Sequence, residues 1–255
     1  MLVLAIGDII GKPGRQAVQR LLPQLRQQYG LGLVMANAEN AAGGIGLTPA
    51  TAEELFDAGV DVLTSGNHIW VHKEIIPYLD GETPVLRPLN YPPGVPGKGY
   101  FITSQAIVVN LMGRTFMGDL DCPFRAMDKL LTELKTKPAV IIVDFHAEAT
   151  SEKVAMGRYL DGRVSAVLGT HTHVGTIDAQ VFPHGTAYVT DIGMTGPIDS
   201  VIGVDTEQVL ERFLTQLPHR FSVTNGRTVF SAMLVNIAND SGRATSIERI
   251  YREVE

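Results

Sequence analysis

The sequence is poor in the features that mark secreted and membrane-spanning proteins. Its 255 residues include a single cysteine, Cys122, so no intramolecular disulfide can form, which suits a reducing compartment. No apolar run approaches the roughly 18 residues that a membrane span needs. The N-terminus lacks the basic and long apolar regions of a signal peptide. We therefore expect a cytoplasmic protein that has no contact with a membrane.

Positive charge is also scarce. Lys and Arg total 21 against 27 Asp and Glu, for a net charge of -6. Proteins that bind nucleic-acid polymers present a basic face, so this balance predicts no such partner. Hydrophobic residues make up 45% of the chain, enough for an ordinary globular core. The Pro- and Gly-rich stretch at 90–99 is expected as a surface loop, and residues 1–255 as a single domain.

Short apolar segments alternate with segments of helical periodicity. We expect strands at residues 2–6, 33–36, 60–64, 107–111, 140–145 and 164–168. Helices are expected at residues 15–29, between Thr48 and Gly59, and at 124–135, 151–160 (capped by Ser151) and 207–217. This alternation implies a largely parallel sheet. Two late hairpins, at 179–190 and 230–251, add antiparallel strands.

Side chains that can bind metals follow these strands one after another. They are, in chain order, Asp8, Glu39, Asn40, Asn67, His68, His146, His171 and His173. Ligands of open α/β sheets bind outside the carboxyl ends of the strands, so we expect these side chains to converge on one edge.

The mixture of carboxylate, amide and imidazole groups favours iron, manganese or zinc over calcium. Two such ions about 3.5–4 Å apart clamp an in-line displacement at phosphorus. A carboxylate such as Glu39 can bridge them. A water shared by two cations loses its proton near neutral pH and becomes a nucleophile. The residue types therefore favour a dinuclear site that acts on a phosphate ester.

Each residue also has a purely structural interpretation. Asp8 alone would be read as a helix cap or a turn residue, Asn67 as a turn residue and His68 as a loop histidine. The pair His171 and His173 carries more weight, because alternation in an extended chain would place both imidazoles on one face. The joint placement of the set at successive strand ends favours the metal site.

Other features are weaker candidates. The stretch at 7–12 resembles a phosphate-binding loop, but it is one residue short of the Walker spacing and is followed by Pro13. Arg87, Asn90 and Arg125 lie in expected loops and could touch a phosphate, although solvated surface charge is the better interpretation of both arginines. Surface, turn or structural roles are expected for His72, His184, His219 and Cys122.

Two motifs resemble those of the calcineurin-like metallophosphoesterase superfamily: Gly66-Asn67-His68 and the later Gly169-Thr170-His171-Thr172-His173. The similarity is greater to the YmdB-like phosphodiesterase branch, whose signature blocks resemble residues 7–8, 37–40, 66–68, 144–150 and 169–173 in order. Ile9-Ile10 follows Asp8, so the superfamily's usual histidine is missing there. Glu39 stands where an aspartate usually bridges the metals. The branch shares both departures.

The resemblance implies a layered α/β/β/α sandwich with mixed sheets in one metallophosphoesterase domain. It implies that one metal is held by Asp8, Glu39, Asn40 and His173, and the other by Glu39, Asn67, His146 and His171. His68 would be the general acid, consistent with an imidazole that titrates near neutrality. Iron or manganese is implied, with zinc as the alternative. The implied substrates are small phosphodiesters, in particular cyclic nucleotides such as 2′,3′-cyclic AMP.

Two alternative functions remain open at this point. A phosphomonoesterase would use the same two metals, because the preference for a diester or a monoester depends on the shape of the pocket. A regulatory protein acting through partners would keep the site only as a remnant. Exposed edge strands in the late hairpins also leave a homo-oligomer open.

Overall fold

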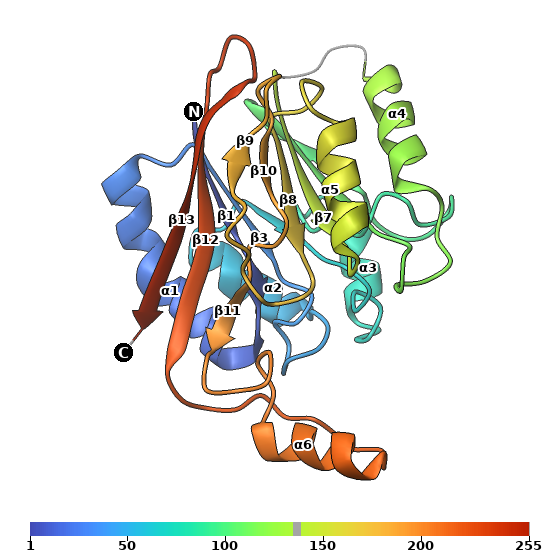
Figure 1. Ribbon diagram of the computed structural model, residues 1–255, viewed down its shortest axis with the longest axis vertical. Helices are drawn as coiled ribbons and strands as arrows, with labels where there is room; N and C mark the ends of the chain where they lie inside the picture. Colours follow the sequence, from blue (N-terminus) through green and yellow to red (C-terminus); the bar gives the residue numbers. More distant parts are fainter. Residues whose placement is uncertain (135–138, 255) are drawn as a thin grey trace.

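Two mixed β-sheets face each other at the centre of the computed structural model, which describes residues 1–134 and 139–254 (Figure 1). The first sheet runs in the order β2-β11-β12-β1-β3-β4, and β13 lies along the other edge of β12. Its strands are β1 (Leu2–Ile6), β2 (Asp8–Ile9), β3 (Leu33–Asn37), β4 (Val62–Thr64), β11 (Met194–Pro197), β12 (Thr228–Ile237) and β13 (Ala244–Val254).

The second sheet runs in the order β5-β6-β7-β8-β10-β9. Its strands are β5 (Tyr100–Ile102), β6 (Ala106–Met112), β7 (Val140–His146), β8 (Ala166–Thr170), β9 (Gln180–Val181) and β10 (Ala187–Val189). The neighbours β1, β3 and β4 are parallel in one sheet, and β6, β7, β8 and β10 are parallel in the other. Each parallel set therefore brings its carboxyl ends to one edge.

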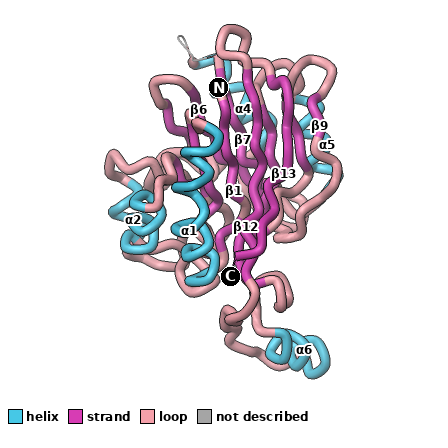
Figure 2. The backbone as a smooth tube through the Cα atoms, turned by 90° about the vertical axis from the view of Figure 1, so that its left-hand side faces the viewer, coloured by secondary structure: helices cyan, strands magenta, loops and turns pink. Residues whose placement is uncertain are grey.

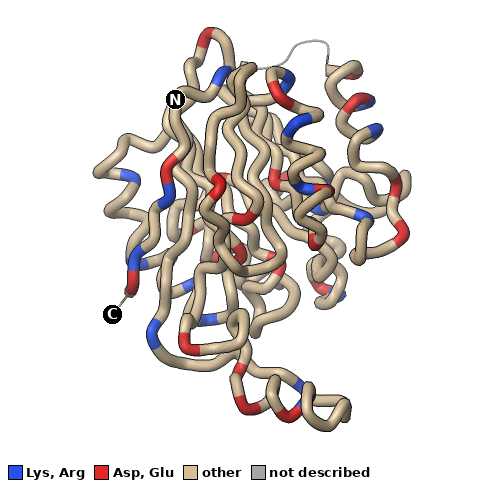
Figure 3. The backbone as a smooth tube through the Cα atoms, in the orientation of Figure 1, with Lys and Arg blue, Asp and Glu red and all other residues tan. Residues whose placement is uncertain are grey.

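Helices cover the outer face of each sheet, as the two views show (Figures 1 and 2). Helices α1 (Gly11–Tyr29) and α2 (Pro49–Asp57) cover the first sheet, and α4 (Pro123–Glu133) and α5 (Thr150–Tyr159) cover the second. The short helix α3 (Ile75–Leu79) packs at the side, and α6 (Thr206–Thr215) projects from the body. Acidic and basic positions are interspersed on α4, α5 and α6 (Figure 3).

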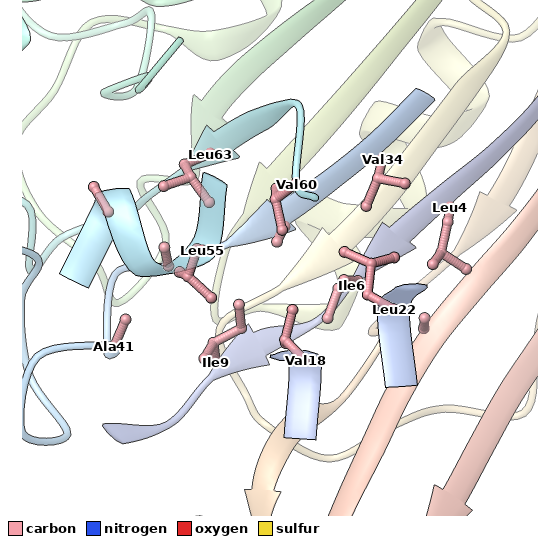
Figure 4. Packing of buried hydrophobic residues seen from close by; sticks show 14 of the residues in the cluster. Leu4, Ile6, Ile9, Val18, Leu22, Val34, Ala41, Leu55, Val60 and Leu63 are labelled. Atoms are coloured by element: carbon pink, nitrogen blue, oxygen red, sulfur yellow. The ribbon is translucent and has the colours of Figure 1, made fainter. Parts of the chain in front are cut away.

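The two-residue period of the strands divides the core into layers. In β1, Leu4 and Ile6 point toward α1 and α2 (Figure 4), whereas Val3 and Ala5 point toward the other sheet. The same division holds on β7, where alternate residues face α4 and α5 or the space between the sheets. Strands buried on both faces are nearly continuous apolar runs, which explains why the sequence shows them so clearly.

Several local signals in the sequence have the expected physical basis. Thr48 forms a capping box with Thr51 at the start of α2. Gly30 ends α1 in the left-handed conformation, with φ of 61°, which costs glycine little. Both late hairpins are antiparallel pairs, β9 with β10 and β12 with β13.

Other local expectations were wrong. Helix α1 begins at Gly11, four residues before the expected start, because Pro13 fits the first turn, where no intrahelical N–H bond is needed. Ser151 does not cap α5. The N-cap is Ala149, and Ser151 lies inside the first turn. The expected end of α4, at Lys135, lies outside the described residues.

Strands β2, β5 and β11 and helix α3 were not expected, because each is five residues or shorter. The fold class is confirmed: the layers follow the order helix, sheet, sheet, helix, and both sheets are mixed. Within residues 1–134 and 139–254, no helix has both the length and the apolar character to cross a membrane.

Candidate metal centre

The space between the sheets changes from apolar to polar at the carboxyl ends of the strands. The inward-facing positions of β7 read Val140, Ile142, Asp144 and His146 in order. Asn37, Thr64 and Thr170 occupy the corresponding last inward positions of β3, β4 and β8. Because one period governs all four strands, the polar residues form a cluster between the sheets. They make the floor of the site.

One group of ligand atoms surrounds the His146 Nε2 atom. Glu39 Oε1 lies 3.1 Å from it, Asn67 Oδ1 3.1 Å and His171 Nδ1 3.0 Å. Glu39, His146 and His171 can direct one ligand atom each at a common point, within 4.8 Å of one another. Four predicted residues, which lie at or just after the ends of four different strands, are therefore brought together.

A second group lies on the other side of Glu39. Asn40 Nδ2 is 3.3 Å from Glu39 Oε1 and 3.1 Å from His173 Nε2. His173 Nε2 is in turn 3.8 Å from Asp8 Oδ1. Glu39 contacts both groups, which is the position that a bridging carboxylate requires.

The carboxylate of Asp8 gives an independent sign of a cation. Its Oδ2 accepts a hydrogen bond from the backbone N–H of His171 at 3.2 Å. Its Oδ1 is buried and has no hydrogen-bond partner among the described residues. A buried carboxylate oxygen without a donor is costly, and a metal ion would satisfy it. Burial raises the pKa of Asp8 from 3.8 to about 6, although the charges of His173 and His146 oppose this.

The charges of Glu39 and His146 stabilise each other in the absence of a metal. Burial by itself would lower the pKa of His146, but the charge and hydrogen bond of Glu39 raise it to about 9. Burial would raise the pKa of Glu39, but His146 holds it well below its usual range. Burial and the charge of His146 lower the pKa of His171 to about 3. A cation at this point would replace the proton on His146.

His68 lies beside both groups without belonging to either. Its backbone N–H donates to Glu39 Oε2 at 3.1 Å, and its Nδ1 lies 2.8 Å from Asn40 Oδ1. Its side chain is about a third exposed, whereas Glu39 is fully buried. An imidazole that adjoins the ligands and reaches solvent is suited to exchanging a proton with a substrate.

A buried carboxylate beneath the ligands was not singled out as functional from the sequence. Asp144 accepts hydrogen bonds from Asn37 Nδ2 at 3.0 Å, from Thr170 Oγ1 at 2.6 Å and from the Thr64 hydroxyl. Because the Thr170 hydroxyl donates to Asp144, its oxygen accepts from His146 Nδ1, 2.9 Å away. This fixes His146 with Nδ1 protonated and Nε2 directed at the other ligands. The sequence did offer one indication of this role, because Asp144 and His146 are alternate residues of one strand and so point to the same side of the sheet.

The expected extended conformation of residues 171–173 was wrong. His171 has φ of 102° and His173 has φ of 65°, so the chain turns at both residues. The two imidazoles therefore reach different groups. His171 lies beside His146, whereas His173 lies beside Asn40 and Asp8. Alternation along a strand could not have predicted this division.

The weaker candidates lie away from this site. His72 bonds the Ile45 carbonyl, and His184 and His219 pair with Asp161 and Glu211. Cys122 is the N-cap residue of α4. Arg87, Asn90 and Arg125 line a separate cavity of about 590 Å³. The Arg87 and Asn90 side chains hydrogen-bond backbone carbonyl groups there, so both have structural roles.

Comparison with known proteins identifies the family. The sequence model of the YmdB-like protein family matches residues 4–250. The 2′,3′-cyclic-nucleotide 2′-phosphodiesterase of Bacillus subtilis is 46% identical over 98% of this chain and 96% of its own.

Two solved structures are also similar. A hypothetical protein from Thermus thermophilus has a TM-score of 0.93 at 49% identity, and each chain is covered over 99% of its length. A novel phosphatase from Mycoplasma pneumoniae has a TM-score of 0.92 at 33% identity, covering 99% of this chain and 93% of its own.

The fold and the named relatives therefore define a hydrolase of the metallophosphoesterase type. The chain belongs to the YmdB-like family. That family implies divalent metals, and the buried Asp8 oxygen and the grouped ligands are chemically suited to them. The expectation that the chain is an enzyme is confirmed.

Proposed function

We propose that this chain is a phosphodiesterase that hydrolyses small cyclic nucleotides such as 2′,3′-cyclic AMP at a dinuclear metal site. The observation that carries the proposal is the contact of Glu39 with two separate ligand groups. A carboxylate at that point could bind both ions of a dinuclear site. The name of the Bacillus subtilis relative supplies the substrate class.

The ligand assignment follows the two groups. Asp8, Glu39, Asn40 and His173 would hold one ion, and Glu39, Asn67, His146 and His171 the other. When bound, two cations would supply a nucleophile by lowering the pKa of coordinated water, and they would neutralise charge on the phosphate group. Iron or manganese is the proposed native metal, and zinc is the alternative. An Asn67→Ala or a His171→Ala variant should bind one of the two ions more weakly, measured by metal content after dialysis.

The protein's own groups position and protonate the substrate. His68 is the proposed general acid, which gives its proton to the leaving alkoxide. Asn40, 2.8 Å from His68 Nδ1, orients the ring, and Glu39 fixes the backbone N–H of the same residue. Asp144 and Thr170 hold the tautomer of His146.

The first test is turnover of 2′,3′-cyclic AMP with added manganese, beside a chelator-treated sample. We expect turnover that the chelator abolishes. Absence of turnover in a sample that holds two metals per chain would overturn the substrate assignment and leave the metal site standing.

The role of His68 is tested with two substrates. His68→Ala should retain both metals and slow turnover of 2′,3′-cyclic AMP by about 10²–10⁴-fold. Turnover of a diester with an activated leaving group should slow much less, because such a group needs no proton to depart. His72→Ala is the matched control, because His72 bonds a backbone carbonyl on the adjacent loop. Equal losses with both substrates would remove His68 from the role of acid.

Phosphomonoester hydrolysis is the second candidate, because the Mycoplasma pneumoniae structure is named a phosphatase. A chromogenic monoester assayed beside the corresponding diester separates the two. We also propose that residues 1–255 act as one catalytic domain in the cytoplasm. Limited proteolysis that yields no stable fragment would support a single domain. Fractionation of the cell tests the cytoplasmic location.

A further inference from the structure

A charged lysine is buried beneath the loop that carries His171 and His173. Lys153, on α5, is only 1% exposed, and its Nζ donates to Asp191 Oδ2 at 2.7 Å. Asp191 itself is fully buried. Removing two charges from water is expensive, and a buried ion pair by itself is weak evidence of stability. The pair is therefore expected to have a role other than stabilising the fold.

The carboxylate of Asp191 also binds backbone and side-chain groups of the loops around it. Its Oδ2 accepts from the Thr172 N–H at 3.1 Å and from the Thr172 hydroxyl at 2.8 Å. Its Oδ1 accepts from the Gly193 N–H at 2.7 Å. Together with Lys153 these make four donors, which only an ionised carboxylate can accept.

Thr172 is the residue between the two histidines, and both histidines have positive φ. Such conformations cost about 1–3 kcal/mol each in non-glycine residues and persist only where the surroundings impose them. Holding Thr172 at two atoms imposes the turn at His171 and at His173 together. The two rings thereby reach separate ligand groups.

We propose that Lys153 and Asp191 are a positioning pair, which holds the strained loop so that one histidine reaches each metal position. This inference rests on the proposed dinuclear site. The pair touches neither substrate nor metal. Its consequence is that one perturbation under the loop weakens both metal positions, whereas loss of a single ligand weakens one.

Lysine is suited to this place because of its length and its charge. Helix α5 begins four residues after His146, so Lys153 ties the segment that follows β7 to the loop after β8. Its stem passes Gly169, where an added Cβ would lie 3.3 Å from the Lys153 Cδ atom. The ammonium group of Lys153 then balances the charge of Asp191, so the carboxylate that holds the loop is neutralised by an ion pair.

The test uses the full-length chain loaded with manganese. Thr172→Val removes the hydroxyl bond to Asp191 and keeps the β-branched shape. We expect manganese affinity at both positions to fall about 10–100-fold, the range for changes behind metal ligands. Thr172→Ser, which keeps the hydroxyl, should restore it. The electron paramagnetic resonance signal of a coupled manganese pair should weaken in the valine variant and return in the serine variant.

A matched control separates positioning from general destabilisation. Thr186→Val removes a buried hydroxyl that donates to the Val164 carbonyl at 2.6 Å, away from the ligands. It should lower the unfolding temperature without changing either manganese affinity. A double variant, Lys153→Met with Asp191→Asn, removes both buried charges and should behave like Thr172→Val if it folds.

The outcomes are distinguishable. Unchanged affinities in Thr172→Val, with two metals in the wild type, would overturn the positioning role. A drop at only one position would also overturn it, because the loop would not join the two. A wild-type protein that binds fewer than two manganese ions would instead refute the proposed dinuclear site.

Discussion

Replacing Asp144 with asparagine should damage the metal site from behind, without touching a ligand. The buried carboxylate accepts three side-chain hydrogen bonds, from Asn37, Thr64 and Thr170. An asparagine amide keeps one acceptor oxygen and places an NH₂ group against groups that already donate. At least one charge-assisted bond is lost, worth about 1.5–3 kcal/mol.

The loss is partly offset by relief of a burial cost. Burial raises the pKa of Asp144, so its negative charge is held at some expense in the wild type. We expect a net loss of about 2 kcal/mol in the free energy of unfolding. The second effect concerns His146: once the Thr170 hydroxyl turns away, nothing fixes Nδ1 as the protonated nitrogen. Manganese affinity at the His146 position should fall about 10–100-fold.

The assay combines urea unfolding of the metal-free protein with calorimetric titration of manganese. Asp128→Asn is the control, because Asp128 also accepts bonds from a tyrosine hydroxyl and an arginine but lies on the surface of α4. It should leave the metal affinity unchanged. Unaltered affinity in Asp144→Asn, with the expected loss of stability, would refute the relay through Thr170 and leave Asp144 as a structural residue only.

Three further outcomes follow from the same geometry. The imidazolium of His146 has a pKa of about 9 and must lose its proton to bind a metal. Apparent manganese affinity should therefore rise close to tenfold per pH unit from pH 7 and level off above about pH 9, and a flat profile measured by calorimetry would contradict this. Gly66→Ala should abolish metal binding at the His146 position, since its Cβ would overlap the His146 ring and the Glu39 carboxylate; metal analysis that finds two ions in a folded variant would refute it. Gly30→Ala should lower the free energy of unfolding by about 1–2 kcal/mol, because the residue has a left-handed backbone conformation. Thermal unfolding measures this loss, and turnover should be unchanged.

The sequence by itself determined most of the longer strands and placed the candidate ligands at or just after the ends of those strands. Apolar runs that end in Asp, Glu, Asn or His are a local property of the chain, and parallel strands bring such ends to one edge whatever the loops do. The caps of α1 and α2 were equally local, because Gly30 and Thr48 act within one turn. The ligand assignment itself remains a proposal.

Tertiary structure alone decided which atoms meet and what holds them. The turns at His171 and His173 send neighbouring rings to different groups. Thr172 between them is bound by Asp191, which lies 19 residues along the chain and is paired with a lysine on another element. Asp144 lies in a block that resembles the family signature, but only the fold shows that it gathers donors from β3, β4 and β8. Long-range hydrogen bonds of this kind depend on the packing of two sheets, and no periodicity along the chain encodes that packing directly.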